Sequence, residues 1–160
     1  MREILFRGKM VDNGGEFVFG IPVEDVVLES VEKQAYIITK PGIQWVDGEY
    51  MTYDECIEVD PETVGQFTGL TDRNGAKIFE GDIIQWHNSP ELSVGGQKAQ
   101  ICFGKYNDTD CAFDDVYSLG FYVKFPKGDC ASICQLEELK DVFDIVGNIY
   151  DNLELLEGRK

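Results

Sequence analysis

Short apolar runs recur along most of the chain, and turn residues separate them. Runs of this length that are rich in β-branched and aromatic residues are typical of β-strands, and residues 97–103 also show the two-residue alternation of a half-buried strand. The pattern predicts strands over residues 3–11, 16–23, 35–39, 43–46, 49–53, 56–59, 64–70, 76–79, 83–86, 97–103, 119–125 and 143–149.

Glycine beside Asn or Asp marks several of the expected turns. These residues tolerate the positive φ angles that tight hairpins require, and the signals are Asp12-Asn13-Gly14-Gly15, Asp47-Gly48 and Asp72-Arg73-Asn74-Gly75. Pro41-Gly42 is expected to break the strand before it. Glycine weakens a plain strand, so a bulge or a sharp corner is expected at Gly69 and Gly81.

Only one segment has the spacing of an amphipathic helix. Leu136 and Leu139 would share one face of a helix over residues 135–142, and residues 151–156 would end the chain in a short turn or helix. The predicted fold class is therefore mainly β, a β-rich α+β fold. It has N-terminal hairpins over residues 1–59 and a small barrel-like part with one short helix over residues 60–160, unless the two form one continuous unit.

The composition supports a folded but strongly acidic protein. Of 160 residues 43% are hydrophobic, which is enough for a core, while 30 acids against 14 bases give a net charge of −16. Such a charge opposes binding to a nucleic-acid backbone, because that binding needs cationic side chains. No Lys or Arg lies between Pro41 and Asp72, although that stretch is rich in acids. A solvated acidic surface explains this; a mimic of nucleic-acid charge and a site for a basic protein are the alternatives.

The cysteines and the N-terminus indicate a cytoplasmic protein. The count is odd, no signal peptide precedes the cysteines, and no apolar run is long enough to cross a membrane. Reduced thiols are expected at Cys56, Cys102, Cys111, Cys130 and Cys134.

No motif predicts a metal or a nucleophile. Cys130 and Cys134 form one close pair, but a zinc site normally needs four ligands, and His87 and the other cysteines are scattered. We interpret these cysteines as small apolar residues or surface thiols, and His87 as an exposed or hydrogen-bonded loop residue.

Two groups of carboxylates are candidates for metal binding or acid–base chemistry. Asp108, Asp110, Asp114 and Asp115 resemble a calcium loop, but the sixth position from Asp108 is Phe113 where that loop needs Gly. A solvated acidic loop is the preferred interpretation. The second group is Asp72, at the start of the Asn74-Gly75 turn, with Glu80 and Asp82 on either side of Gly81. Acid–base chemistry is an alternative there, but side chains that accept backbone N–H groups explain these residues without catalysis.

Two glycine pairs and a group of aromatic residues each have a structural explanation beside a functional one. The Gly-Gly pairs at 14–15 and 95–96 lack the lysine or helix of a phosphate-binding loop. Trp45, Tyr50 and Tyr53 lie among acids, which suits a protein-binding surface as well as a β core with a polar outer face.

Several segments together resemble the YopX family of phage and prophage proteins. They are residues 2–8 (REILFRG), 17–20 (FVFG), 59–70 (VDPETVGQFTGL), 72–75 (DRNG), 78–84 (IFEGDII), 146–152 (VGNIYDN) and 155–156 (LL). The resemblance covers essentially the whole chain except residues 87–128. It implies a bacterial or phage-derived intracellular protein with a β-rich fold that self-associates. It implies no activity and carries over no catalytic residues.

The sequence thus predicts an accessory protein, not an enzyme, that acts by protein–protein interaction with itself or with an unknown protein. No catalytic, cofactor-binding or metal-binding residue is assigned, and neither nucleic acid nor membrane is an expected partner. The alternatives are an acidic DNA mimic or inhibitor of a host nucleic-acid enzyme, and an enzyme with an unrecognised site. Weak binding of nucleic acid by a small barrel rests on analogy alone.

Overall fold

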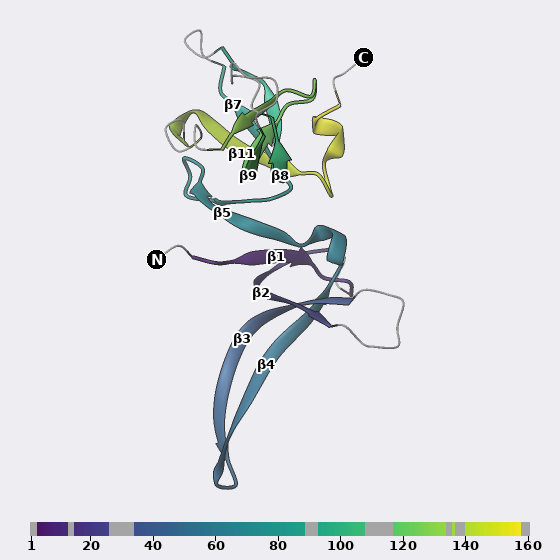
Figure 1. Ribbon diagram of the computed structural model, residues 1–160, viewed down its shortest axis with the longest axis vertical. Coiled ribbons are helices and arrows are strands. Elements are labelled where there is room, and N and C mark those ends of the chain that lie inside the picture. The colour runs from purple at the N-terminus through teal and green to yellow at the C-terminus, as the bar shows by residue number, and fades with distance from the viewer. Residues whose placement is uncertain are drawn as a thin grey trace. The chain divides into compact units, whose positions relative to one another are not determined.

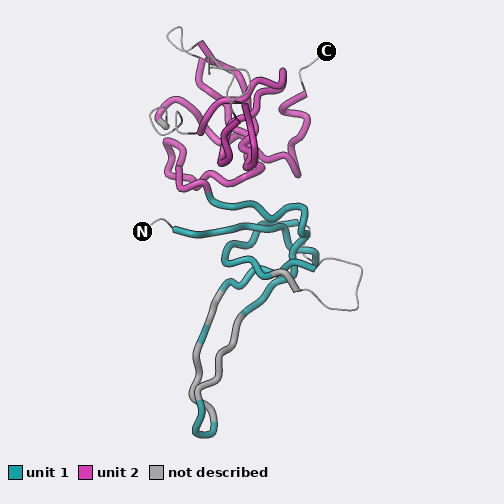
Figure 2. The backbone as a smooth tube through the Cα atoms, viewed as in Figure 1, with its two compact units in different colours: residues 1–67 teal, residues 68–160 magenta. Residues whose placement is uncertain are grey.

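The chain folds as two compact units, residues 1–67 and residues 68–160, which are described separately (Figure 2). The structure is a computed structural model, and it describes residues 3–12, 15–25, 34–88, 93–107, 117–133, 136 and 140–157. We expected a boundary near Asp60. Residues up to Phe67 belong to the first unit because the next strand begins by pairing with the first one, Phe6 with Gln66 and Arg7 with Gly65.

The first unit is an antiparallel sheet. Its strands are β1 (Phe6–Lys9), β2 (Phe17–Asp25), β3 (Gln34–Val46), β4 (Glu49–Val59) and the start of β5 (Gly65–Thr71), in the order β4-β3-β2-β1-β5. A short 3-10 helix, η1 (Pro61–Thr63), connects β4 to β5. One face carries a small core of Ala35, Ile37 and Val59, against which Phe6, Val18 and Val64 pack.

The β3–β4 hairpin is longer than the strands beside it. β2 pairs with β3 only from Gln34 to Ile38, whereas β3 and β4 remain paired as far as Val46 and Glu49 (Figure 1). The hairpin closes at the predicted turn, where Asp47 has φ 48° and Gly48 has φ 92°. We call the part of the hairpin beyond Ile38, residues 39–55, the hairpin arm.

The predicted break at Pro41-Gly42 is wrong. β3 runs through both residues, after a register shift between Ile38 and Lys40, and the strands expected over 49–53 and 56–59 are one continuous β4. Past Ile38 one edge of β3 is free of β2, so a residue without an N–H is tolerated there.

The second unit is built on a five-stranded antiparallel sheet. It contains β7 (Asp82–Trp86), β8 (Lys98–Tyr106), β9 (Ser118–Lys124), β10 (Cys130–Ser132) and β11 (Phe143–Asn148), in the order β10-β9-β8-β7-β11. The end of β5 and β6 (Lys77–Phe79) precede it, joined by a hydrogen bond from Thr68 Oγ1 to the Ile78 carbonyl of 2.9 Å. The core is Ile78, Ile84, Trp86, Ala99, Ile101, Val123, Leu136 and Phe143.

Helix contributes little to the described chain. Leu136 is helical, residues Lys140–Val142 form the 3-10 helix η2, and Leu153–Leu155 form the 3-10 helix η3. The rest of the helix predicted over 135–142 lies outside the described residues. The mainly β fold class is confirmed. No helix in the described part of the chain is long and apolar enough to cross a membrane.

Candidate functional site

Asp72 and Asp82 both accept hydrogen bonds from backbone N–H groups. Asp72 Oδ1 accepts from the N–H groups of Asn74 at 2.8 Å and Ala76 at 2.9 Å, which closes the turn in which Gly75 has φ 79°. Asp82 Oδ2 accepts from the Phe79 N–H at 2.8 Å, and Asp82 is only 2% exposed. The interpretation of both acids as turn-forming residues is confirmed.

A third carboxylate, that of Asp144 on β11, forms hydrogen bonds with side chains from two other segments. Arg73 donates to it from Nε and Nη2 at 2.7 and 2.9 Å, and His87 Nε2 lies 2.9 Å from Oδ2. Asn74 Nδ2 donates to Oδ1 at 3.2 Å. The hydrogen bond with His87, and then the hydrogen bond and charge of Arg73, lower the pKa of Asp144. The interpretation of His87 as a hydrogen-bonded loop residue is confirmed.

The chemistry of this cluster is limited by its surroundings. A cavity of about 170 Å³ adjoins it, lined by Gln85, Trp86, His87, Asn88, Asp144 and Val146. The carboxylate of Asp144, which lines the cavity, already accepts four contacts. The cluster therefore ties the turn after β5 and the end of β7 to β11. Sequence reasoning missed it because Asp144 lies 57 residues from His87.

The three described cysteines lie on three strands, Cys56 on β4, Cys102 on β8 and Cys130 on β10, and none forms a disulfide. Cys102 and Tyr122 pair across β8 and β9. Burial is the main cause that raises the pKa of the Cys102 thiol, and burial with the nearby Cys102 raises the pKa of Tyr122 to about 12. Cys130 lies on β10 and is half-buried, as a thiol with no disulfide. Cys134 lies outside the described residues.

Metal ligands do not gather in the part of the chain that the structure describes. No group of three or more His, Cys, Asp or Glu side chains there could hold an ion. The carboxylates at 108, 110, 114 and 115 lie outside the described residues, as does Gly14. Gly95 and Gly96 lie in a turn before β8, where Gly96 has φ 74°.

The first unit exposes apolar side chains on the face of its sheet opposite the small core. Phe19, Ile21 and Val23 occupy alternate positions of β2 and are 49%, 54% and 42% exposed. Beside them on β3, Ile38 pairs with Ile21 and Tyr36 pairs with Val23. We call these five residues the β2 face. Exposed apolar residues that are contiguous mark interaction sites more often than single ones do.

Cations border the β2 face at one end. The Arg7 guanidinium carbon lies 4.3 Å and Lys9 Nζ lies 5.5 Å from the centre of the Phe17 ring. These distances suit cation–π contacts. The aromatic residues singled out in the sequence lie farther along the sheet, in the hairpin arm, where Trp45 pairs with Tyr50 and Gly42 pairs with Tyr53.

Comparisons with known proteins place this fold. A family model described as YopX protein matches residues 22–157. The crystal structure of protein EF1440 from Enterococcus faecalis is similar, with a TM-score of 0.58 and 23% sequence identity over 98% of this chain and 99% of that chain. No curated protein sequence matches.

Proposed function

The chain belongs to the YopX family, and from this premise we propose that it is a non-enzymatic accessory protein of phage or prophage type that works by binding protein. We further propose that it self-associates through the β2 face. The observation that carries the proposal is the row of Phe19, Ile21 and Val23, each between 42% and 54% exposed on one sheet face.

A second copy is a suitable occupant because the row is self-complementary. A twofold axis through Ile21 would pack Phe19 of each copy against Val23 of the other, which is the arrangement of an isologous interface. Burying the exposed half of one such side chain contributes about 1 kcal/mol. Association has a substantial entropic cost, so a three-residue row supports a weak, concentration-dependent dimer.

Light scattering after size exclusion, run over a concentration series, tests this proposal. The native protein should move from monomer towards dimer mass as its concentration rises, and Ile21→Asp should stay monomeric, because a carboxylate in the contact loses its hydration. Leu119→Asp is the matched control, since Leu119 is 78% exposed but lies in the second unit.

Circular dichroism and thermal melting must show that both variants fold. A native protein that is monomeric at every concentration would refute self-association. A dimer that Ile21→Asp leaves intact would place the contact elsewhere.

A further inference from the structure

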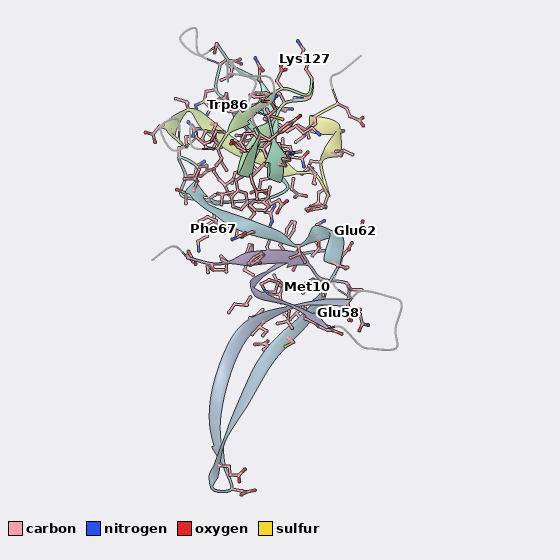
Figure 3. The ribbon with its side chains drawn as sticks, viewed as in Figure 1. Met10, Glu58, Glu62, Phe67, Trp86 and Lys127 are labelled. Carbon is pink, nitrogen blue, oxygen red and sulfur yellow. The ribbon has the colours of Figure 1, made fainter. Side chains whose placement is uncertain are left out.

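β4 is an edge strand with an unusually long open side. It has 11 residues and stands last in the order β4-β3-β2-β1-β5. On the side away from β3, the described contacts are confined to its C-terminal end, where Met10 bridges Val59 and the Val11 N–H donates to the Glu58 carbonyl at 3.3 Å (Figure 3). No described residue pairs with the open side of β4 before Glu58.

The hydrogen bonds fix which backbone groups face the open side. The Glu58 carbonyl points away from β3, towards Val11, whereas the Glu55 carbonyl points towards β3 and accepts from Thr39 Oγ1 at 3.2 Å. In a strand the N–H and C=O of one residue point to the same side, and the side alternates along the chain. The backbone groups of Tyr50, Thr52, Asp54 and Cys56 therefore face the open edge.

β4 has few of the devices that usually protect an edge. Proteins commonly use prolines, charged side chains, bulges or very short strands to keep an edge from pairing. β4 contains no proline and no lysine, and the register shift in the hairpin falls on β3 between Ile38 and Lys40, so the acids of β4 are its one such device. In addition, a two-stranded hairpin is marginally stable by itself in water, and the hairpin arm has only two described strands. A third strand would stabilise it.

The charge of β4 selects the kind of strand that fits. Glu49, Asp54, Glu55 and Glu58 are acidic, and β4 has no base. Any antiparallel pairing of β4 with a second copy of itself would set acids only against acids or neutral residues, and like charges across strands are destabilising. A strand that carries Lys or Arg would instead gain opposite-charge pairs.

We propose that the open edge of β4 binds an extended, cationic segment of another protein by β-strand addition. Main-chain hydrogen bonds to residues 50–56 would supply the affinity, and the acids of β4 would supply the selectivity for a basic partner. This inference shares with the proposed function the premise that the protein binds protein, but it uses the edge of the sheet, whereas self-association uses the β2 face.

The test measures fluorescence anisotropy of a labelled short peptide that alternates lysine with valine and threonine. We expect saturable binding that weakens as salt screens the charges, and no binding of the same peptide with glutamate in place of lysine. A third peptide keeps every lysine but carries an N-methyl group on every residue. It should bind at least about tenfold more weakly, because neither of its edges can donate hydrogen bonds to β4.

Protein variants test the edge itself. Thr52→Pro removes an N–H that faces the open side and leaves the ladder to β3 intact, so binding should fall at least about tenfold, while Thr52→Ala should bind like the native protein. Ile21→Asp should also bind normally, which separates this edge from self-association. Circular dichroism checks the fold of each variant. The N-methyl peptide tests strand pairing without any change to the native protein.

Three results would overturn the inference. Equal binding of the lysine peptide and its N-methyl form would show diffuse attraction between charges without strand pairing. Unchanged binding by a folded Thr52→Pro variant would place the peptide elsewhere. A change from dimer to monomer mass on Thr52→Pro alone would make a second copy the occupant of the edge.

Discussion

Replacing Asp82 tests whether this acid is structural. Its Oδ2 accepts the Phe79 N–H at 2.8 Å, and Asp82 and Phe79 are both only 2% exposed. Asp82→Ala removes a hydrogen bond to a charged acceptor and leaves a buried N–H without that partner. Hydrogen bonds to charged groups are worth about 1.5–3 kcal/mol. We therefore expect Asp82→Ala to lower the free energy of unfolding by about 2–3 kcal/mol.

Urea denaturation followed by circular dichroism measures this change. Asp82→Asn keeps an oxygen that can accept the bond but loses the charge, so its cost should be smaller, about 1 kcal/mol. Asp141→Ala is the control for a lost negative charge at an exposed position, and it should change stability by no more than about 0.5 kcal/mol. If Asp82→Ala and Asp141→Ala unfold at the same urea concentration, the structural account of Asp82 is wrong.

Three further predictions concern the second unit and the thiols. The pKa of Asp144 is lowered in the folded protein, so its charged form stabilises the fold above the unfolded pKa of about 3.9, and this stability is lost as pH falls through the folded pKa. The melting temperature of Asp144→Asn should therefore fall less on acidification than that of the native protein. Urea denaturation should show a larger loss of unfolding free energy for Gly81→Ala than for Gly75→Ala. Both glycines have positive φ, which costs a non-glycine residue about 1–2 kcal/mol. Only at Gly81 would the new Cβ also meet a tyrosine ring, at 3.0 Å. Iodoacetamide followed by peptide mass spectrometry should modify the exposed Cys56 before Cys102, whose raised pKa leaves less thiolate; the reverse order would contradict that burial.

Turns were the best-predicted features because their chemistry is local. The Asp47-Gly48 turn depends on positive φ angles, and the Asp72–Gly75 turn also depends on the Asp72 side chain, which accepts backbone N–H groups two and four residues away. Such requirements can be read from a few adjacent residues. The strands between these turns follow from the same signals, which is why the mainly β class could be predicted.

Features that depend on distant partners were missed. Pro41 looked like a strand breaker, but β3 can include it because the pairing of β3 with β2 stops at Ile38, and residues 17–20 of β2 pair with β1 instead. The His87–Asp144 contact joins residues that no local pattern connects. The three-residue β10 is too short to show alternation, and its pairing with β9, Cys130 opposite Lys124, is what makes it a strand.

Two groups of acidic residues, one held inside the second unit and one on β4, bear on the idea of a nucleic-acid mimic. Asp72, Asp82 and Asp144 are held by backbone or side-chain donors within the second unit. Those of β4 lie at positions 49, 54, 55 and 58. With a rise of about 3.3 Å per residue, the successive gaps along the strand are very uneven. Phosphates recur evenly, about every 3.4 Å along each DNA strand. The charge of β4 therefore fits short contacts with a basic peptide better than an imitation of a phosphate backbone.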